Sequence, residues 1–284
     1  MSLEQFERGA RPSRAVRLTF ALAILVACAM AQASPSSAAT ALAPKRIADA
    51  GSIVLCSDMT GPPLEFLDPN TNPIGSDIDI GAELAKRFGV KAEWKNIPFK
   101  GLIPALLAQQ CDAVISQLFD KPERRQAIDM VDYMNSSEAF LVHAGNPKKV
   151  QGIEDLSGLK VAVENGTTIQ ELIEDQNKKF AAAGKKPADV VVYPKDTDAL
   201  QALQIGEADV YGTTLETGAF YMSKSPQTFE VAGPPFHQIL TGIGLRKNDG
   251  DMTAAVQKAI DGMKSDGTLL AILKKWNIEG DMIK

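Results

Sequence analysis

Apolar residues along the chain follow two patterns in alternation, short runs and helical spacing. The run at 53–56 predicts a buried strand, and Ile80, Leu84 and Phe88 recur at the i, i+4, i+8 spacing of a helix that Gly89 should end. Further strands are expected at 90–95, 112–116, 159–163, 190–193, 208–212 and 239–246. Further helices are expected around 103–107, 169–173, 199–203 (capped by Asp196 or Thr197), 252–263 and 269–276. This alternation indicates an α/β protein with largely parallel sheets, arranged as two units with a cleft between them.

The first 33 residues have the pattern of an export signal. An arginine-rich start precedes a short apolar run at 18–31 and small residues, which is typical of a secretory signal peptide and too short for a comfortable transmembrane helix. Ala31-Gln32-Ala33 fits an ordinary cleavage site. Leu25-Val26-Ala27-Cys28 also resembles a bacterial lipobox, in which Cys28 would be lipidated. Either route predicts a periplasmic protein, soluble in the first case and lipid-anchored in the second.

The charge and composition exclude several classes of function. The chain carries 30 basic and 35 acidic residues, a net charge of −5, and removing 1–33 leaves 26 basic and 33 acidic residues, a net charge of −7. Nucleic-acid binders usually present a basic face, so nucleic acid is disfavoured as a partner. Two histidines and three cysteines provide little material for a metal cluster or a His-based triad. Most hydrolase mechanisms are therefore unlikely. No cofactor or metal is expected, and no triad, metal-ligand spacing or phosphate loop supports an enzyme.

Export permits disulfides, but the spacing of the two cysteines beyond the signal argues against one. Cys56 ends one apolar run and Cys111 precedes the run at 113–115. In neighbouring parallel strands these positions lie at opposite ends, about 13 Å apart at strand rise. A disulfide needs Cα atoms within about 7 Å. The expectation is two buried thiols.

Six motifs occur in an order and spacing that identify a family. They are Gly75-Ser-Asp-Ile-Asp-Ile-Gly-Ala-Glu-Leu-Ala-Lys-Arg-Phe-Gly-Val90, Gly101-Leu-Ile-Pro-Ala-Leu106, Cys111-Asp-Ala-Val-Ile-Ser116 with Lys121-Pro-Glu-Arg-Arg125, Asn165-Gly-Thr-Thr168, Gly242-Ile-Gly-Leu-Arg-Lys247 and Ser265-Asp-Gly-Thr268. With them the chain resembles the family 3 extracytoplasmic solute-binding proteins of ABC transporters, from Ile53 to about Trp276.

The resemblance implies a type 2 periplasmic-binding fold, in which two α/β lobes joined by two crossover strands close around a solute. Lobe 1 is expected to comprise residues 46–140 and 240–284, and lobe 2 residues 141–239, with crossovers near 137–142 and 239–244. The implied ligand is an amino acid or a related small carboxylate. The implied protein partner is the membrane permease of an ABC importer, and the chain is expected to be monomeric.

The resemblance also implies how the solute's carboxylate is held. Arg124 is expected to bind it, because a planar guanidinium matches a carboxylate bidentately and a lysine does not; the alternative is a solvated arginine in the charged run 123–125. Thr167 and Thr168 precede a helix, where free N–H groups favour an anion. The resemblance assigns carboxylate binding to Thr168 and the N–H of Ile169, whereas the alternative is that the hydroxyls cap the helix.

Four further residues are expected at the ligand. Phe99 falls where related proteins place an apolar or aromatic wall, although it can equally be a core residue. Asp58 matches a position that faces the ligand side chain in binders of basic amino acids, although it can equally form a turn. Ser116 and Thr214 complete the expected set.

Departures from the family pattern concentrate at the site of the ligand's ammonium. Thr214 stands where an aspartate usually pairs with the α-ammonium. Phe119 and Gln117 replace small hydroxyl residues, and Gly61 replaces a common aromatic. Two explanations follow: Glu216 supplies the missing acid, or the solute has no free α-ammonium.

Two alternatives to a transport protein remain. One is a dehydratase-like enzyme of the same fold, in which Glu65 or Glu216 would act as the general acid or base. The other is a sensor that presents its ligand to a membrane receptor. The sequence alone does not separate transport from sensing.

Overall fold

The computed structural model describes residues 42–283. The signal segment at 1–33, including Cys28, lies outside the described residues. No helix within 42–283 is long and apolar enough to cross a membrane.

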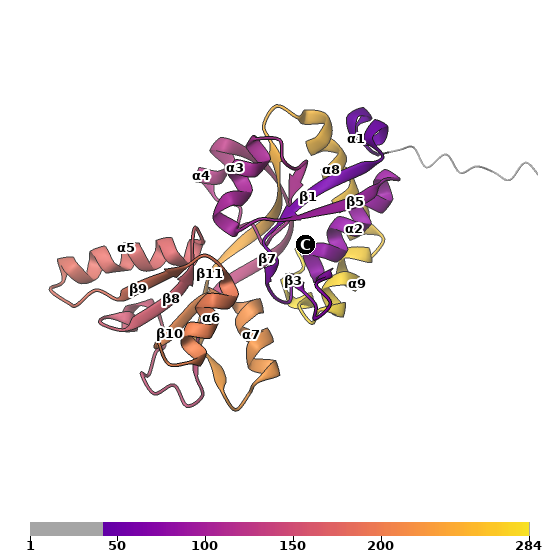
Figure 1. The fold of residues 1–284 in the computed structure, drawn as a ribbon. Helices are drawn as coiled ribbons and strands as arrows, with labels where there is room; N and C mark the ends of the chain where they lie inside the picture. The colour runs from indigo at the N-terminus through magenta and orange to yellow at the C-terminus, as the bar shows by residue number, and fades with distance from the viewer. Residues whose placement is uncertain (1–41, 284) are drawn as a thin grey trace, which may run out of the picture. The chain divides into compact units, whose positions relative to one another are not determined.

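An eight-stranded sheet forms the centre of the fold, in the order β5-β1-β6-β11-β7-β10-β8-β9. Its strands are β1 (Ser52–Ser57), β5 (Lys91–Asn96), β6 (Ala113–Val114), β7 (Ile128–His143), β8 (Lys160–Glu164), β9 (Asp189–Tyr193), β10 (Val210–Thr214) and β11 (Phe229–Arg246). β1 is parallel to β5 and β6, and β8 is parallel to β9 and β10. β7 and β11 are antiparallel to each other along most of their length and run through the middle of the sheet (Figure 1).

The helices and the short strands complete the secondary structure. The longer helices are α2 (Ser76–Phe88), α5 (Thr168–Ala182), α6 (Asp196–Gln204), α7 (Leu215–Lys224), α8 (Gly250–Ser265) and α9 (Thr268–Lys275). The shorter ones are α1 (Lys45–Ala50), α3 (Leu102–Leu107) and α4 (Pro122–Ala127), with 3-10 turns at Phe99–Gly101, Ile153–Leu156 and Glu279–Asp281. A separate three-stranded sheet contains β2 (Thr60–Gly61), β3 (Glu65–Leu67) and β4 (Pro73–Ile74).

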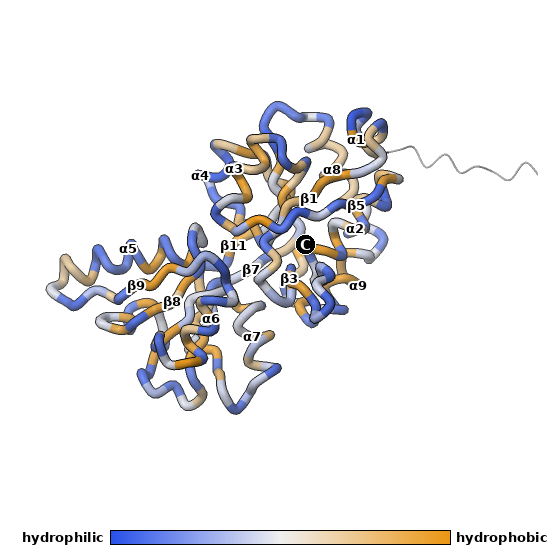
Figure 2. Tube along the Cα trace, in the orientation of Figure 1, coloured by the Kyte–Doolittle hydropathy of each residue, from blue (hydrophilic) through white to orange (hydrophobic). Residues whose placement is uncertain are grey.

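Two sets of buried apolar side chains define two lobes. One set contains Ile53 and Leu55 of β1 with Phe88 of α2, and the other contains Val161 and Val163 of β8. Figure 2 shows hydrophobic residues along β8 and β9 and recurrent hydrophilic residues along α5. The fold is therefore the expected type 2 periplasmic-binding fold, two α/β lobes joined by β7 and β11. The residue boundaries at 140/141 and 239/240 stay a prediction.

Most expected elements are present, but several bounds differ. The strand expected at 112–116 is only Ala113–Val114, and the return at 239–246 is the second half of β11. α6 begins at Asp196, and its N-cap is Lys195 without a side-chain cap, so the expectation of an Asp196 or Thr197 cap was wrong. β7 includes the crossover expected near 137–142, but its first part, residues 128–136, was not expected as a strand, because its burial pattern does not follow a period-2 alternation.

The start of α2 shows why its sequence is so restricted. Gly75 has φ 135°, and a Cβ there would lie 1.9 Å from the carbonyl oxygen of Leu64. Only glycine fits this position. Asp77 in the first turn is fully buried and accepts hydrogen bonds from the backbone N–H of Gln117 and the hydroxyl of Tyr133, at 2.8 Å each. The helix start thereby fixes the loop after β6, which lines the cavity described below.

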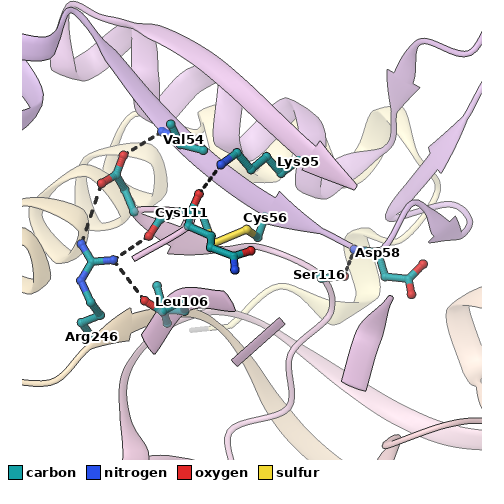
Figure 3. Close-up of a disulfide and its surroundings, with 10 residues drawn as sticks. Val54, Cys56, Asp58, Lys95, Leu106, Cys111, Ser116 and Arg246 are labelled. Atoms are coloured by element: carbon teal, nitrogen blue, oxygen red, sulfur yellow. Dashed lines mark hydrogen bonds and ion pairs between the residues drawn. A yellow bond between two sulfur atoms is a disulfide. The ribbon is translucent and has the colours of Figure 1, made fainter. Parts of the chain in front are cut away.

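Cys56 and Cys111 form a disulfide, which corrects the expectation of two free thiols. Their Cα atoms are 5.8 Å apart. The 13 Å estimate assumed that Cys111 continues an extended strand, but β6 begins only at Ala113, and Cys111 lies in the irregular segment that follows α3. Arg246 Nη1 donates to the carbonyl of Cys111 at 2.6 Å and helps hold this segment beside β1 (Figure 3).

The disulfide lies close to two residues of the predicted site. Asp58 follows Cys56 by two positions, Ser116 follows Cys111 by five, and the backbone N–H of Asp58 donates to the Ser116 hydroxyl at 2.9 Å (Figure 3). The disulfide closes a loop with a sequence separation of 55. A loop of this length corresponds to about 4 kcal/mol of stabilisation in the chain-entropy model.

We expect the double variant Cys56→Ser/Cys111→Ser to lose about 2–4 kcal/mol of unfolding free energy. Urea unfolding of the wild type, with and without a reducing agent, measures the same difference. The reductant should lower the wild-type midpoint and leave the variant unchanged. Equal midpoints for oxidised and reduced wild type would contradict this prediction.

Candidate functional site

One cavity collects all eight residues predicted to bind the ligand. It has an empty volume of about 540 Å³ including its mouth, and both lobes line it. The predicted residues in its wall are Asp58, Phe99, Ser116, Arg124, Thr167, Thr168, Ile169 and Thr214. Their contribution to ligand binding stays a prediction.

Arg124 is buried and oriented by two aromatic residues. It belongs to the short helix α4 and is only 9% exposed, so it is not the solvated arginine of the alternative explanation. Its Nη1 donates to the carbonyl of Phe119 at 2.9 Å, and its guanidinium lies 5.5 Å from the centroid of the Phe99 ring. Burial lowers the pKa of Arg124 to about 10, while the charges of Glu171, Glu138 and Glu123 oppose the shift. The guanidinium is therefore positively charged at neutral pH.

The N-terminus of α5 faces the same cavity from the other lobe. The hydroxyl of Thr167 donates to the carbonyl of Glu164 at 2.8 Å and does not cap the helix. Thr168 is 6% exposed, and its Oγ1 has no hydrogen-bond partner among the described residues. The first N–H groups of a helix also have no partner within the helix. This end of the cavity therefore offers a hydroxyl and free N–H donors.

Three carboxyl groups, which we call the acidic cluster, gather at another part of the wall: Asp58, Glu164 and Asp196. The Thr60 hydroxyl donates to Asp58 at 2.7 Å, and the backbone N–H of Phe99 does so at 2.6 Å. Oε1 of Glu164 and Oδ2 of Asp196 are buried without a partner among the described residues. The cluster therefore has two carboxyl oxygens whose hydrogen-bonding capacity is not used within the described residues.

Burial is the main cause of the unusual pKa values in the acidic cluster. It raises the pKa of Glu164 to about 11, with the neighbouring charges of Asp58 and Asp196 acting in the same direction. It raises the pKa of Asp196 to about 7. The pKa of Asp58 is also raised by burial, while hydrogen bonds from Thr60 and others and the charge of Lys195 oppose the shift. A cation that binds beside such a group stabilises its ionised form and can replace its proton.

Ser116 and Glu65 complete the wall near β1. The Ser116 hydroxyl accepts from the N–H of Asp58 and donates to Oε1 of Glu65 at 3.0 Å, so both of its hydrogen-bonding roles are used within the protein. Gly61 also lines the cavity, and Oε1 of Glu65 lies 3.2 Å from the position of a Cβ there. The carboxyl group of Glu65 thus borders the space left by the missing aromatic.

Thr214 has a structural role in addition to its place in the wall. Its Oγ1 accepts from the backbone N–H of Thr217 and caps α7, and it lies 3.2 Å from Nε2 of Gln117. Gln117 also donates to Oε2 of Glu216 at 2.9 Å, and the Ser136 hydroxyl donates to the same oxygen at 2.7 Å. Glu216 is not among the lining residues. Its Oε2 is thus hydrogen-bonded behind the wall, whereas its Oε1 is buried without a partner among the described residues.

Residues 53–279 match the family model of the bacterial extracellular solute-binding proteins, family 3. The chain belongs to this family. Family 3 proteins of known kind include amino-acid-binding proteins, such as the L-cystine-binding protein TcyJ of Escherichia coli (strain K12). That protein is 30% identical over 232 residues, which cover 81% of this chain and 84% of TcyJ.

Two solved structures with the same fold are also similar. An ancestral arginine-binding protein bound to arginine is 32% identical, with a TM-score of 0.74 and coverage of 80% of this chain and 98% of that one. The ancestral amino acid-binding protein AncCDT-1, described as a precursor of cyclohexadienyl dehydratase, is 31% identical, with a TM-score of 0.73 and coverage of 81% and 97%. The chain is thus an extracellular solute-binding protein of family 3, similar in sequence and fold to proteins that bind amino acids.

Several acids in the cavity of this family 3 protein were not predicted from the sequence. Glu138, Glu164 and Asp196 all line it and are at least nine-tenths buried. Glu164 directly precedes the Asn165-Gly-Thr-Thr168 motif, so its position at a strand end was a usable signal. Asp196 was interpreted only as a helix cap. No group of three or more His, Cys, Asp or Glu residues within 42–283 is arranged to hold a metal ion.

The acidic cluster predicts that the ligand-free protein loses stability as the pH rises. In the unfolded chain these carboxyl groups titrate near pH 4. Since the folded protein keeps its protons up to about pH 7 at Asp196 and higher at Glu164, it binds more protons than the unfolded chain over this range. The unfolding free energy therefore falls between pH 5 and pH 8.

We expect Glu164→Gln to reduce that fall, measured as the difference between urea midpoints at pH 5 and pH 8. Glu207→Gln removes an exposed carboxyl group and serves as the control, with a difference like that of the wild type. A Glu164→Gln protein with the full wild-type pH dependence would contradict the assignment.

Proposed function

We propose that this protein captures an α-amino acid whose far end carries a positive charge, and delivers it to the permease of an ABC importer. The observation that carries the proposal is the distribution of charge in the cavity. Five acids line it, namely Asp58, Glu65, Glu138, Glu164 and Asp196, whereas the lining set contains one basic residue, Arg124. A ligand with one carboxylate and two cationic groups complements this arrangement.

Arg124 and the N-terminus of α5 are proposed to hold the α-carboxylate. Arg124 offers a guanidinium already oriented by Phe119 and Phe99, and Thr168 offers a hydroxyl without a partner. The N–H of Ile169 adds a donor at the helix start, and Thr167 positions this turn through its bond to Glu164. Because these donors come from different lobes, only the closed state satisfies all of them, and the ligand favours closure.

Phe99 is proposed to connect the two ends of the ligand site. Its ring lies beside Arg124, and its backbone N–H donates to Asp58. An apolar stem that follows this ring would place its terminal cation at the acidic cluster. The arginine-bound relative supports a ligand with a cationic far end. The cystine-binding relative suggests L-cystine as a second candidate, whose far end carries an ammonium and a carboxylate.

The remaining parts of the proposal concern place and partners. Export by the segment at 1–33 would deliver the chain to the periplasm, with a lipid anchor if Cys28 is modified. We expect a monomer that does not bind nucleic acid. The lobes are taken as 46–140 with 240–284, and 141–239.

A catalytic role is the second candidate, favoured by buried carboxyl groups in the cavity and by the dehydratase precursor among the similar structures. Burial raises the pKa of Glu65 well above its usual range, which suits a general acid. Mass spectrometry of incubated cyclic acids decides this: an unchanged compound supports binding alone, and a product lighter by one water supports a dehydratase.

We expect Arg124→Ala to abolish binding of L-arginine in calorimetry, and Arg124→Lys to weaken it by at least tenfold, because a lysine cannot make the bidentate contact. Arg125→Lys is the matched control: Arg125 bonds Asp120 outside the cavity and should leave the affinity unchanged. Wild-type affinity in Arg124→Lys would disprove the carboxylate contact.

A panel of L-arginine, L-lysine, L-ornithine, L-cystine and L-glutamine tests the acidic cluster. We expect the basic amino acids to bind the wild type most tightly and Asp196→Asn to reduce their affinity about tenfold or more, with little change for L-glutamine. A panel led by L-glutamine, or an equal effect of Asp196→Asn on all five compounds, would contradict a cationic far end. If L-cystine bound most tightly, the acidic cluster would be assigned to the binding of the second ammonium of that ligand.

Small-angle scattering tests closure. We expect saturating L-arginine to reduce the radius of gyration of the wild type and to leave that of Arg124→Ala unchanged. An equal radius for ligand-free and saturated wild type would contradict closure on the ligand.

A further inference from the structure

The cavity contains an acid whose carboxylate has no partner at all within the described residues. Glu138 of β7 is 2% exposed and lines the cavity, yet no hydrogen bond or ion pair of residues 42–283 reaches its side chain. Its carboxyl oxygens are not fully enclosed by protein atoms, so they are accessible from the cavity. A cationic group of a ligand in the cavity can therefore reach Glu138.

Glu138 lies directly opposite Thr214. The two residues are Cα partners in the antiparallel pairing of β7 with β10, and both line the cavity. Side chains at such paired positions project from the same face, with Cβ atoms about 4.5–5.5 Å apart. Thr214 holds the position at which the resemblance led us to expect an aspartate for the ligand's α-ammonium. The acid is therefore present, but on the neighbouring strand.

We propose that Glu138 binds the α-ammonium of the ligand, in place of an acid at position 214. This inference rests on the proposed amino-acid function and assigns one residue of its site. Arg124 and Glu138 are close enough for each charge to shift the pKa of the other. An α-ammonium is adjacent to its own carboxylate, so a carboxylate on Arg124 places the ammonium near Glu138.

The alternative acid, Glu216, is poorly placed for this role. Its Oε2 already accepts hydrogen bonds from Gln117 and Ser136, its Oε1 is enclosed by protein atoms, and Glu216 does not line the cavity. Burial raises the pKa of Glu138 well above its usual range, with the charge of Glu216 adding to the shift and that of Arg124 opposing it. A ligand ammonium would replace the proton that burial favours.

The test compares L-arginine with 5-guanidinopentanoate, which is the same molecule without its α-amino group, by calorimetry at one pH. The wild type should prefer L-arginine, and Glu138→Gln should lose about 30-fold or more of its affinity for L-arginine with less than a threefold change for 5-guanidinopentanoate. If Glu138 had only a structural role, its replacement would lower the affinity for both ligands together and leave the preference unchanged.

Two further variants sharpen the result. Glu138→Gln/Thr214→Asp returns an acid to the opposite position and should restore the preference for L-arginine. Glu216→Gln should keep the wild-type preference. The proposal is overturned if Glu138→Gln changes both affinities by the same factor, or changes neither affinity. It is also overturned if the folded double variant shows no preference for L-arginine, or if Glu216→Gln loses that preference. Failure of the wild type to bind any of the basic amino acids or L-cystine would overturn the proposed function itself, whereas Arg124-dependent binding with an unchanged preference in Glu138→Gln would overturn only the role of Glu138.

Discussion

The burial of many acids beside one guanidinium is the constraint on which the cavity depends. Arg124 is held by the carbonyl of Phe119 and by the ring of Phe99, so its charge is fixed in place rather than free to follow the nearest carboxylate. The acids around it have few donors of their own within the described residues, and burial raises their pKa values. A cavity of this kind is incomplete without a ligand that brings positive charge to more than one place.

The pairing of the backbone strands places these acids and Arg124 around one cavity. β7 and β11 pair along most of their length and connect the lobes, so a residue in the middle of β7 can reach a cavity that both lobes line. Glu138 uses that position. The disulfide and the buried Asp77 fix the neighbouring loops from the first lobe, and the start of α5 contributes from the second. The rigid parts are thus the strand ends and helix starts, from which the polar side chains extend.

The alternation of apolar runs and helical spacing was sufficient to predict the α/β fold, and the motifs around Arg124 and Thr168 predicted one end of the site. The disulfide was predicted wrongly, because the estimate treated Cys111 as part of a strand that begins two residues later. Glu138 was missed for a different reason. Its relation to Thr214 depends on strand register across 76 positions of sequence, and no local pattern reports which residues pair across a sheet.

Hydrogen bonds and an ion pair also join residues of the two lobes across the cleft. Gln117 reaches Glu216, the N–H of Asp196 donates to Thr60 at 3.3 Å, and Lys121 pairs with Glu171. Because these contacts join protein groups to one another, they add to the stability of an arrangement in which the lobes lie this close, beside any contacts that a solute makes with both lobes. The same contacts must break before the solute can leave. Opening of the cleft is therefore opposed by contacts between the lobes as well as by contacts with the solute.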